Sequence, residues 1–236
     1  TGLRVLNVMD NDFSGELPQN IGSLTSLTYL SLASNSFNGT LPGSLGQLTN
    51  LNFLDASENL LSGEIPEDIG IQRLLYLSLS SNNLNGAIPS TIGDTNVTYL
   101  DLAMNMLQGS LPSEVRRLTT LEDLILNGNH LEGSIMDNFF SEMSNLKSVY
   151  LYDNHFNDTF PSSIGSAVNL TVLDVHSNHF SGVILENVKG LGKLEYLDVQ
   201  YNFFQGAFPS DLSAWGSIQQ LIVANNNFTG ALPSDI

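Results

Sequence analysis

The sequence predicts an α/β solenoid, a right-handed superhelix with a parallel β-sheet on its concave face and mostly non-helical or 3-10 outer segments. Two observations predict it. A repeat of 23 to 25 residues runs through the whole chain, and all eight prolines stand at one position of that repeat. Periods of this length are typical of coils stacked along one axis. We therefore expect residues 1–236 to form one domain of ten repeats, uncapped at both ends.

Every repeat opens with the apolar pattern Leu-x-x-Leu-x-Leu or a close variant of it. The alternation of apolar and variable residues predicts a short strand with one buried face. In the second repeat, Leu27, Leu30 and Leu32 are expected to point inward. The ten repeats begin at Leu3, Leu27, Leu51, Leu74, Val97, Leu121, Leu146, Leu170, Leu194 and Ile218.

An asparagine closes this pattern in all ten repeats. Its amide has both donors and acceptors, so we expect a stacked column that satisfies the backbone where each coil turns. A large apolar residue, often phenylalanine, follows two positions later and predicts a buried spine. Glycine comes two positions further on, where it suits a positive φ, and Asp158 replaces it in one repeat. The asparagines are Asn11, Asn35, Asn59, Asn82, Asn105, Asn129, Asn154, Asn178, Asn202 and Asn226.

The proline position marks the outer segment of each coil. Met136 and Leu185 occupy it in the two repeats that lack proline. Proline is costly inside a helix or a central strand, so this position predicts a non-helical segment away from the sheet. Trp215 stands where other repeats have leucine and is expected in the core.

The segment 63–70, Gly-Glu-Ile-Pro-Glu-Asp-Ile-Gly, completes a repeat that resembles the plant-type leucine-rich repeat. This class builds the ectodomains of plant receptor-like kinases and receptor-like proteins, and the secreted polygalacturonase inhibitors. The resemblance covers nearly the whole chain and is specific for the fold, whereas ligands differ among proteins that share it. Family ectodomains usually carry cysteine-paired caps, and this sequence has no cysteine, so we expect an excerpt of a longer protein.

The resemblance implies a non-catalytic module that binds a protein or peptide ligand outside the cell or at its surface. The expected role is ligand recognition by a cell-surface receptor, with a co-receptor as a further partner and any kinase domain outside this segment. The alternative is a secreted inhibitor or decoy of the polygalacturonase-inhibitor type. An ice-binding solenoid would need an outward row of threonine or similar residues, and no outward column is uniform in that way.

The charge balance narrows the choice of partners. With 24 acidic and 7 basic residues, the formal net charge is -17, which opposes nucleic acid and anionic lipid. We expect a basic or neutral polar ligand instead. No apolar run approaches the ~20 residues that span a bilayer, so this segment is not expected to insert into a membrane.

The residues between the buried leucines map the exposed face of the predicted sheet. In the C-terminal half, aromatic rings, histidines and carboxylates come together, as they do on recognition surfaces. We predict the ligand site there. Its residues are Tyr150, Tyr152, Asp153, His155, Asp174, His176, His179, Asp198 and Tyr201.

A second candidate is a stripe of aromatic residues in the N-terminal half, one from each of four successive repeats. Two interpretations remain open: the rings anchor a ligand, or strand-favouring aromatics pack laterally on an exposed sheet. The stripe consists of Tyr29, Phe53, Tyr76 and Tyr99.

The sequence shows no credible catalytic site. It lacks a glycine-rich phosphate loop, a Gly-x-Ser-x-Gly elbow and a His-Glu-x-x-His pair. Asp174, His176 and Ser177 would stand side by side without an orienting pocket. The spacing of His155, His176 and His179 matches no standard metal motif, so we expect neither a metal nor a cofactor.

Five Asn-x-Ser/Thr sequons occur, about the number that this composition gives by chance, so they are no evidence of secretion. The extracellular context that the resemblance implies would make them candidates for glycosylation. They begin at Asn38, Asn96, Asn157, Asn169 and Asn227.

Overall fold

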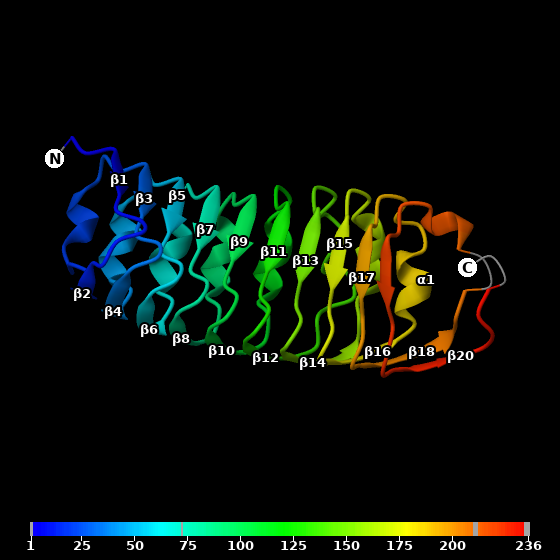
Figure 1. Ribbon diagram of the computed structural model, residues 1–236. Helices are drawn as coiled ribbons and strands as arrows, with labels where there is room; N and C mark the ends of the chain where they lie inside the picture. The colour runs from blue at the N-terminus through cyan, green and yellow to red at the C-terminus, as the bar shows by residue number, and fades with distance from the viewer. Residues whose placement is uncertain (1, 72, 210–211, 234–236) are drawn as a thin grey trace.

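The computed structural model describes the chain except for residues 1, 72, 210–211 and 234–236. It is a solenoid in which each repeat contributes one short strand to each of two sheets (Figure 1). Within the described residues both sheets have ten strands, which pair in parallel and follow one another in chain order. The predicted parallel-sheet solenoid is therefore confirmed.

The first sheet forms from the apolar pattern that opens each repeat. The middle residue of a strand points into the core, as at Leu30, which is 0% exposed. Its neighbours face outward, and the in-register pairing of Tyr29 with Phe53 lines equivalent side chains up in columns. The strands are β1 (Val5–Asn7), β3 (Tyr29–Ser31), β5 (Phe53–Asp55), β7 (Tyr76–Ser78), β9 (Tyr99–Asp101), β11 (Asp123–Ile125), β13 (Ser148–Tyr150), β15 (Val172–Asp174), β17 (Tyr196–Asp198) and β19 (Gln220–Ile222).

The second sheet was not predicted from the sequence. It forms from the segments after the asparagine column, whose backbone pairs with the same segment of the next repeat. In Figure 1 it runs along the lower side of the molecule. The strands are β2 (Ser14–Glu16), β4 (Ser36–Thr40), β6 (Leu60–Glu64), β8 (Asn83–Gly86), β10 (Met106–Gly109), β12 (His130–Gly133), β14 (His155–Thr159), β16 (His179–Gly182), β18 (Phe203–Ala207) and β20 (Asn227–Thr229).

The outer segments are mostly 3-10 turns, as predicted. Pro42 precedes one of them with φ -65°, the value its ring imposes. Leu185, which replaces proline, lies inside the short α-helix α1, and the segment after Met136 forms turns at 137–142. In the part of the chain that the structure describes, no helix is long and apolar enough to cross a membrane. The outer helices are η1 (Ile21–Ser23), η2 (Gly43–Gln47), η3 (Glu67–Ile71), η4 (Ser90–Asp94), η5 (Ser113–Arg117), η6 (Ser162–Ser166), α1 (Ile184–Val188) and η7 (Ser213–Trp215).

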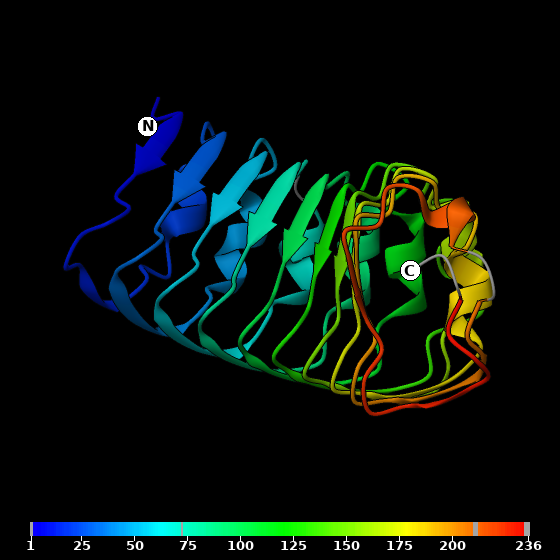
Figure 2. The same cartoon turned by 45° about the vertical axis from the view of Figure 1, so that its right-hand side comes forward.

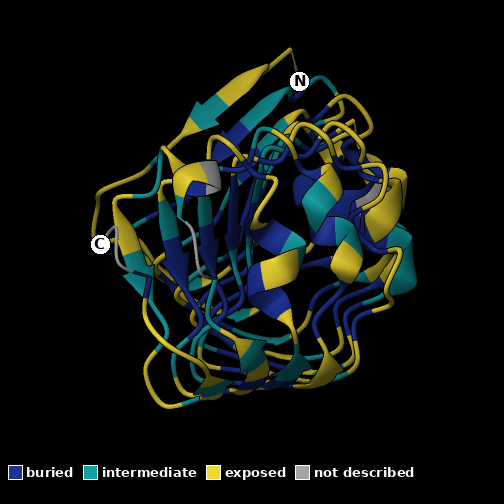
Figure 3. Cartoon of the chain, turned by 90° about the vertical axis from the view of Figure 1, so that its right-hand side faces the viewer, coloured by how far each residue is buried: buried dark blue, intermediate teal, exposed yellow. Residues whose placement is uncertain are grey.

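The core is one continuous apolar column enclosed by the two sheets and the outer turns (Figure 3). The predicted spine is present in it: Phe156, Phe180 and Phe204 are each 0% exposed. Their rings stack from repeat to repeat, with centroids 5.7 and 6.3 Å apart. Burying such a side chain stabilises the fold by about 1.5–3 kcal/mol. Trp215 is 4% exposed, which confirms its place in the core.

The asparagine column joins each repeat to the one before it. Asn59 is 7% exposed, and its Nδ2 donates to the carbonyl of Leu32 at 3.0 Å and to that of Ser57 at 3.0 Å. Its Oδ1 accepts the backbone N–H of Phe37 at 2.9 Å. One side chain thus satisfies groups of its own turn and of the preceding coil, which confirms the predicted role.

The glycine position requires positive φ, as at Gly39, where φ is 73°. Asp158, the exception in the sequence, keeps this geometry with φ 68°. An aspartate tolerates the left-handed region because its short side chain bonds the local backbone. Its Oδ1 accepts the N–H of Thr159 at 2.9 Å. The second sheet therefore continues without interruption through this repeat.

Candidate functional site

The concave face is the outward side of the first sheet, together with the loops that follow its strands (Figure 2). Paired residues of neighbouring strands stand ~4.8 Å apart across such a sheet. Tyr150 of β13 pairs with Asp174 of β15, and Asp174 pairs with Asp198 of β17. Three residues of the predicted site therefore form one column.

Asp174 and His176 form the centre of this region. His176 Nδ1 lies 2.6 Å from Asp174 Oδ1, and the backbone N–H of His176 donates to the same oxygen at 3.2 Å. Asp174 is 5% exposed, and burial raises the pKa of its carboxyl while the hydrogen bond from His176 opposes that rise. A carboxylate this buried needs hydrogen bonds to remain charged. His176 supplies two of them, one from its ring and one from its backbone, and the bond to the ring fixes the orientation of the imidazole.

Asp198 is held in a similar way by its own repeat. It is 2% exposed and accepts hydrogen bonds from the Gln200 backbone N–H at 3.0 Å and from Gln200 Nε2 at 3.0 Å. The Tyr196 hydroxyl donates to it at 3.4 Å. Burial and the nearby carboxylates of Asp174 and Asp198 raise the pKa of Tyr196 to about 12. Tyr196 is therefore a neutral phenol at physiological pH.

Two tyrosines cover this polar centre. The ring of Tyr152 stacks on His176, with centroids 4.5 Å apart and 9° between the planes. Tyr150 meets Tyr152 edge to face at 6.4 Å. Both are half-buried, and burial raises the pKa of both phenols. We define the concave cluster as Tyr150, Tyr152, Asp174, His176 and Asp198.

The remaining predicted residues lie at the edge where the first sheet turns into the second. Asp153, His155, His179 and Tyr201 line a shallow depression of about 590 Å³ there. The rings of His130, His155 and His179 follow one another with centroids 5.8 and 6.2 Å apart. Asp153 links this depression to the concave cluster, because its Oδ1 lies 4.0 Å from His176 Nε2. The nine predicted residues thus occupy one continuous surface.

The N-terminal stripe is a separate feature. Its four rings stack face to face, with centroids 4.2, 4.3 and 4.5 Å apart. Such contact uses the ring faces for packing and leaves only the edges outward. This geometry agrees with the interpretation that the aromatic rings pack laterally on an exposed sheet. Strand β11, with Asp123 and Ile125, lies between the stripe and the concave cluster. A ligand at the stripe stays a prediction.

The charges are unevenly distributed around the coil. None of the seven basic residues lies in a strand of either sheet. Three of them form ion pairs away from the concave face: Arg117 with Asp94, Lys147 with Glu122, and Lys189 with Glu186. Among the described residues, the carboxylates of the concave cluster and Asp153 have His176 as a neighbour but form no ion pair with lysine or arginine, so the face favours cationic groups.

The concave cluster contains side chains of the types that bind metals. In the part of the chain that the structure describes, Asp174, His176 and Asp198 place one donor atom each within 4.8 Å of one another. This is not the set of histidines weighed from the sequence. The donors already take part in hydrogen bonds with one another and with Gln200, and we assign no metal to them. Among the described contacts, Ser177 makes no side-chain hydrogen bond to His176.

The sequon asparagines differ in accessibility. Four of them are exposed, whereas Asn169 is half-buried and its amide is engaged. Its Nδ2 donates to the Ser144 carbonyl at 2.9 Å, and Lys193 Nζ donates to its Oδ1 at 2.6 Å. The exposed ones are Asn38, Asn96, Asn157 and Asn227.

The sequence reasoning missed a groove of about 800 Å³ along the edge where the chain enters the first sheet. Its residues come from the positions directly before and after the first leucine of each repeat, which lie outside the apolar strand pattern. The signal was present, because these positions hold arginine, amide and hydroxyl side chains. The groove is lined by Arg4, Ser26, Thr28, Asn50, Asn52, Arg73, Leu75 and Asn96.

A solenoid with a polar and aromatic concave face is the architecture of a repeat-built binding module. The chain belongs to the leucine-rich-repeat family. The family model for the Leucine Rich Repeat matches residues 2–24, 26–48, 50–70, 73–94, 96–118, 145–167, 169–191 and 193–215. A search of curated proteins found no match.

Solved structures of the same fold include two plant receptors. One is the plant peptide hormone receptor RGFR1 in complex with RGF2, 31% identical with a TM-score of 0.92 over 98% of this chain and 37% of that chain. Another is the ectodomain of the Arabidopsis thaliana membrane receptor kinase GASSHO1/SCHENGEN3 in complex with CASPARIAN STRIP INTEGRITY FACTOR 2. It is 30% identical with a TM-score of 0.83, over 98% of this chain and 31% of that chain.

A plant ice-binding protein also has this fold. It is 28% identical with a TM-score of 0.78, and the match covers 98% of this chain and 75% of that one. The chain spans 37% and 31% of the lengths of the two receptor structures. These proteins and this chain share the solenoid fold. A shared fold does not determine the ligand, which depends on the side chains at the surface of this chain.

Proposed function

We propose that this chain is a ligand-recognition module that binds a protein or peptide ligand across the concave cluster and the adjoining depression. The observation that carries the proposal is the convergence there of half-buried aromatic rings, an oriented imidazole and buried carboxylates. Rigid aromatic rings beside fixed polar groups supply contact area and hydrogen bonds at low entropic cost.

The ligand is a basic or neutral polar one. Asp153, Asp174 and Asp198 surround His176, and no lysine or arginine of either sheet lies among them, so the carboxylates outnumber the one imidazole. The phenols of Tyr150 and Tyr152 are neutral donors at physiological pH, as an ordinary phenol is, and burial raises their pKa further. A lysine or arginine side chain of a peptide would find the exposed carboxylate of Asp153 within reach, together with aromatic rings for cation–π contact.

Similarity to a plant peptide hormone receptor supports a receptor role at the cell surface or outside the cell. A co-receptor as a further partner and glycans on the exposed sequons outside the groove, at Asn38, Asn157 and Asn227, belong to the same proposal. The secreted-inhibitor alternative has no specific observation in its favour. Ice binding is disfavoured because the outward columns mix aromatic, acidic and aliphatic side chains, as in Tyr99, Asp123 and Val172.

The proposal is tested with a display library of short random peptides. We expect peptides rich in lysine, arginine and aromatic residues to be enriched on the parent chain. Changing Tyr152, His155 and Tyr201 together to alanine should abolish their binding with little loss of stability, because these side chains are half-buried or exposed. The matched control is Met136→Ala, a residue 48% exposed near the outer turns. Equal binding by the triple variant and the parent would place the site elsewhere.

A further inference from the structure

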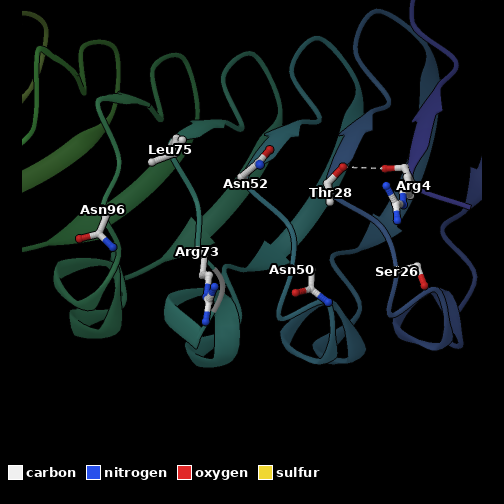
Figure 4. Close-up of a pocket in the computed structure, with 8 residues that line it drawn as sticks. All are labelled: Arg4, Ser26, Thr28, Asn50, Asn52, Arg73, Leu75 and Asn96. Carbon is white, nitrogen blue, oxygen red and sulfur yellow. Dashed lines mark hydrogen bonds between the residues drawn. The ribbon is translucent and has the colours of Figure 1, made fainter.

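The groove at the entry edge of the first sheet is lined by two arginines and by no carboxylate. Figure 4 shows its side chains in two rows, one before and one after the start of each repeat. Arg4 and Arg73 are both exposed there. Within the described residues no ion pair involves either guanidinium, although the chain has 24 acidic residues. These two cations are therefore available to an anionic ligand.

The same two columns change character along the solenoid. In the first five repeats they contain two arginines and no carboxylate. In later repeats carboxylates appear beside the basic residues, and Glu122 pairs with Lys147 at 2.6 Å. Along these two columns, only the part that lines the groove has more basic than acidic side chains. An anion approaching the molecule is repelled by the acidic concave face and attracted at this edge.

The lining between the arginines is almost entirely uncharged and polar. Asn52 and Asn96 are exposed and have no side-chain hydrogen bond among the described contacts, so their amides can both donate and accept. Thr28 donates to the Arg4 carbonyl at 3.0 Å, and Asn50 donates to the Thr25 carbonyl at 3.0 Å. These bonds hold the two side chains along the wall of the groove.

Leu75 is the one apolar residue among those lining the groove, and no aromatic ring lines it. A peptide would find no pocket there for an apolar anchor. A ligand with hydroxyl groups along its whole length and acidic groups at intervals matches the amides, hydroxyls and arginines. Arg4 and Arg73 lie three repeats apart, about 14 Å at the spacing of neighbouring strands. They are therefore suited to separate acidic groups of one extended ligand.

We propose that this groove binds an acidic oligosaccharide, with Arg4 and Arg73 each pairing with a carboxylate of the sugar chain. Guanidinium and carboxylate form paired hydrogen bonds because their geometries match. The intervening amides and hydroxyls bond the sugar hydroxyls. This site is on a different face from the peptide surface and does not depend on it.

The test is fluorescence polarisation of an end-labelled uronic-acid oligosaccharide, with the whole chain made in a host that adds no N-linked glycan at Asn96. We expect saturable binding that weakens as salt rises. Arg4→Ala and Arg73→Ala should each weaken binding about ten-fold, the loss of one charge-assisted hydrogen-bonding group. Arg116→Ala is the matched control, since Arg116 is exposed on η5 outside the groove and should bind like the parent.

Two further probes decide the chemistry. A neutral oligosaccharide of equal length should bind at least ten-fold more weakly, and so should an oligo-glutamate peptide of similar charge. Three results would overturn the proposal: no binding of the uronic-acid probe at low salt, equal weakening by Arg116→Ala, or binding of oligo-glutamate as tight as that of the sugar. Circular dichroism of each variant is the control for folding.

Discussion

Removing one asparagine from the buried column should destabilise the whole solenoid. Asn105 is 7% exposed, and its Nδ2 donates to the carbonyls of Leu79 at 3.0 Å, Leu102 at 3.2 Å and Ala103 at 3.1 Å. Its Oδ1 accepts the backbone N–H of Leu84 at 3.0 Å. Asn105→Ala leaves the buried Leu84 N–H and at least one carbonyl without this partner.

Each orphaned buried group costs about 1–3 kcal/mol, so we expect Asn105→Ala to lower the free energy of unfolding by about 2–4 kcal/mol. Asn11 is the matched control in the same column. It is exposed and bonds only the carbonyls of Val8 and Met9 in its own turn, at 3.1 and 2.9 Å. Asn11→Ala should cost about 0.5–1 kcal/mol.

The assay is urea denaturation followed by circular dichroism, with hydrogen exchange of individual amides alongside. Exchange is needed because a solenoid can unfold repeat by repeat, and a single free energy then loses its meaning. The Leu84 amide should lose protection in Asn105→Ala and keep it in Asn11→Ala. If the two variants differ by less than about 1 kcal/mol and Leu84 stays protected, the column is not what joins the repeats.

Three further predictions concern the backbone, the core and pH. A Cβ on Gly39 would lie 2.8 Å from a side chain of the preceding repeat, and the φ of Gly39 is +73°. Gly39→Ala should therefore lower the free energy of unfolding by about 1–2 kcal/mol in thermal unfolding. Gly43→Ala is the control and should change it little, because a Cβ on Gly43 would meet no atom within 4 Å. Phe180→Ala should lower the free energy of unfolding by about 3–5 kcal/mol, because Phe180 is buried in the core. Phe203→Ala should lower it by less than about 1 kcal/mol, because Phe203 is 54% exposed. Equal losses of the two variants in urea unfolding would contradict the core assignment. Burial raises the pKa of Asp101 above its ordinary 3.8, so the folded state binds the extra proton and loses stability as pH rises through the raised value. Asp101→Asn should therefore gain stability relative to the parent as pH rises above about 4 and match the parent at lower pH. A difference in unfolding free energy that is independent of pH would refute this.

The fold could be predicted because each position of the repeat has one physical task. Pro42 cannot lie inside a helix, so the segment around it is predicted to be an outer turn. Asn59 supplies the hydrogen bonds that the buried backbone needs where the coil turns. The second sheet could not be predicted from alternation, since its strands contain glycine and polar residues. They pair because every coil repeats the same backbone path, so that Gly63 faces Leu84 in register whatever the side chains are.

The candidate site was predictable as a list of outward residues but not as a set of contacts. The sequence places Asp174 and His176 two residues apart, yet the 2.6 Å bond between them depends on rotamers. The predicted site also grouped His155 with His176, whereas His176 belongs to the concave cluster and His155 lines the edge depression. The arginine groove was missed because Arg4 and Arg73 lie 69 positions apart and only coiling brings them to one edge.

Hydroxyl-radical footprinting of the chain with a library-selected peptide tests the central claim most directly, because it reports which side chains the ligand covers. We expect Tyr152, His176 and Tyr201 to be protected, while Met136, exposed near the outer turns, reacts as in the free chain. Protection of Met136 with no change at Tyr152 and Tyr201 would contradict recognition on the concave face.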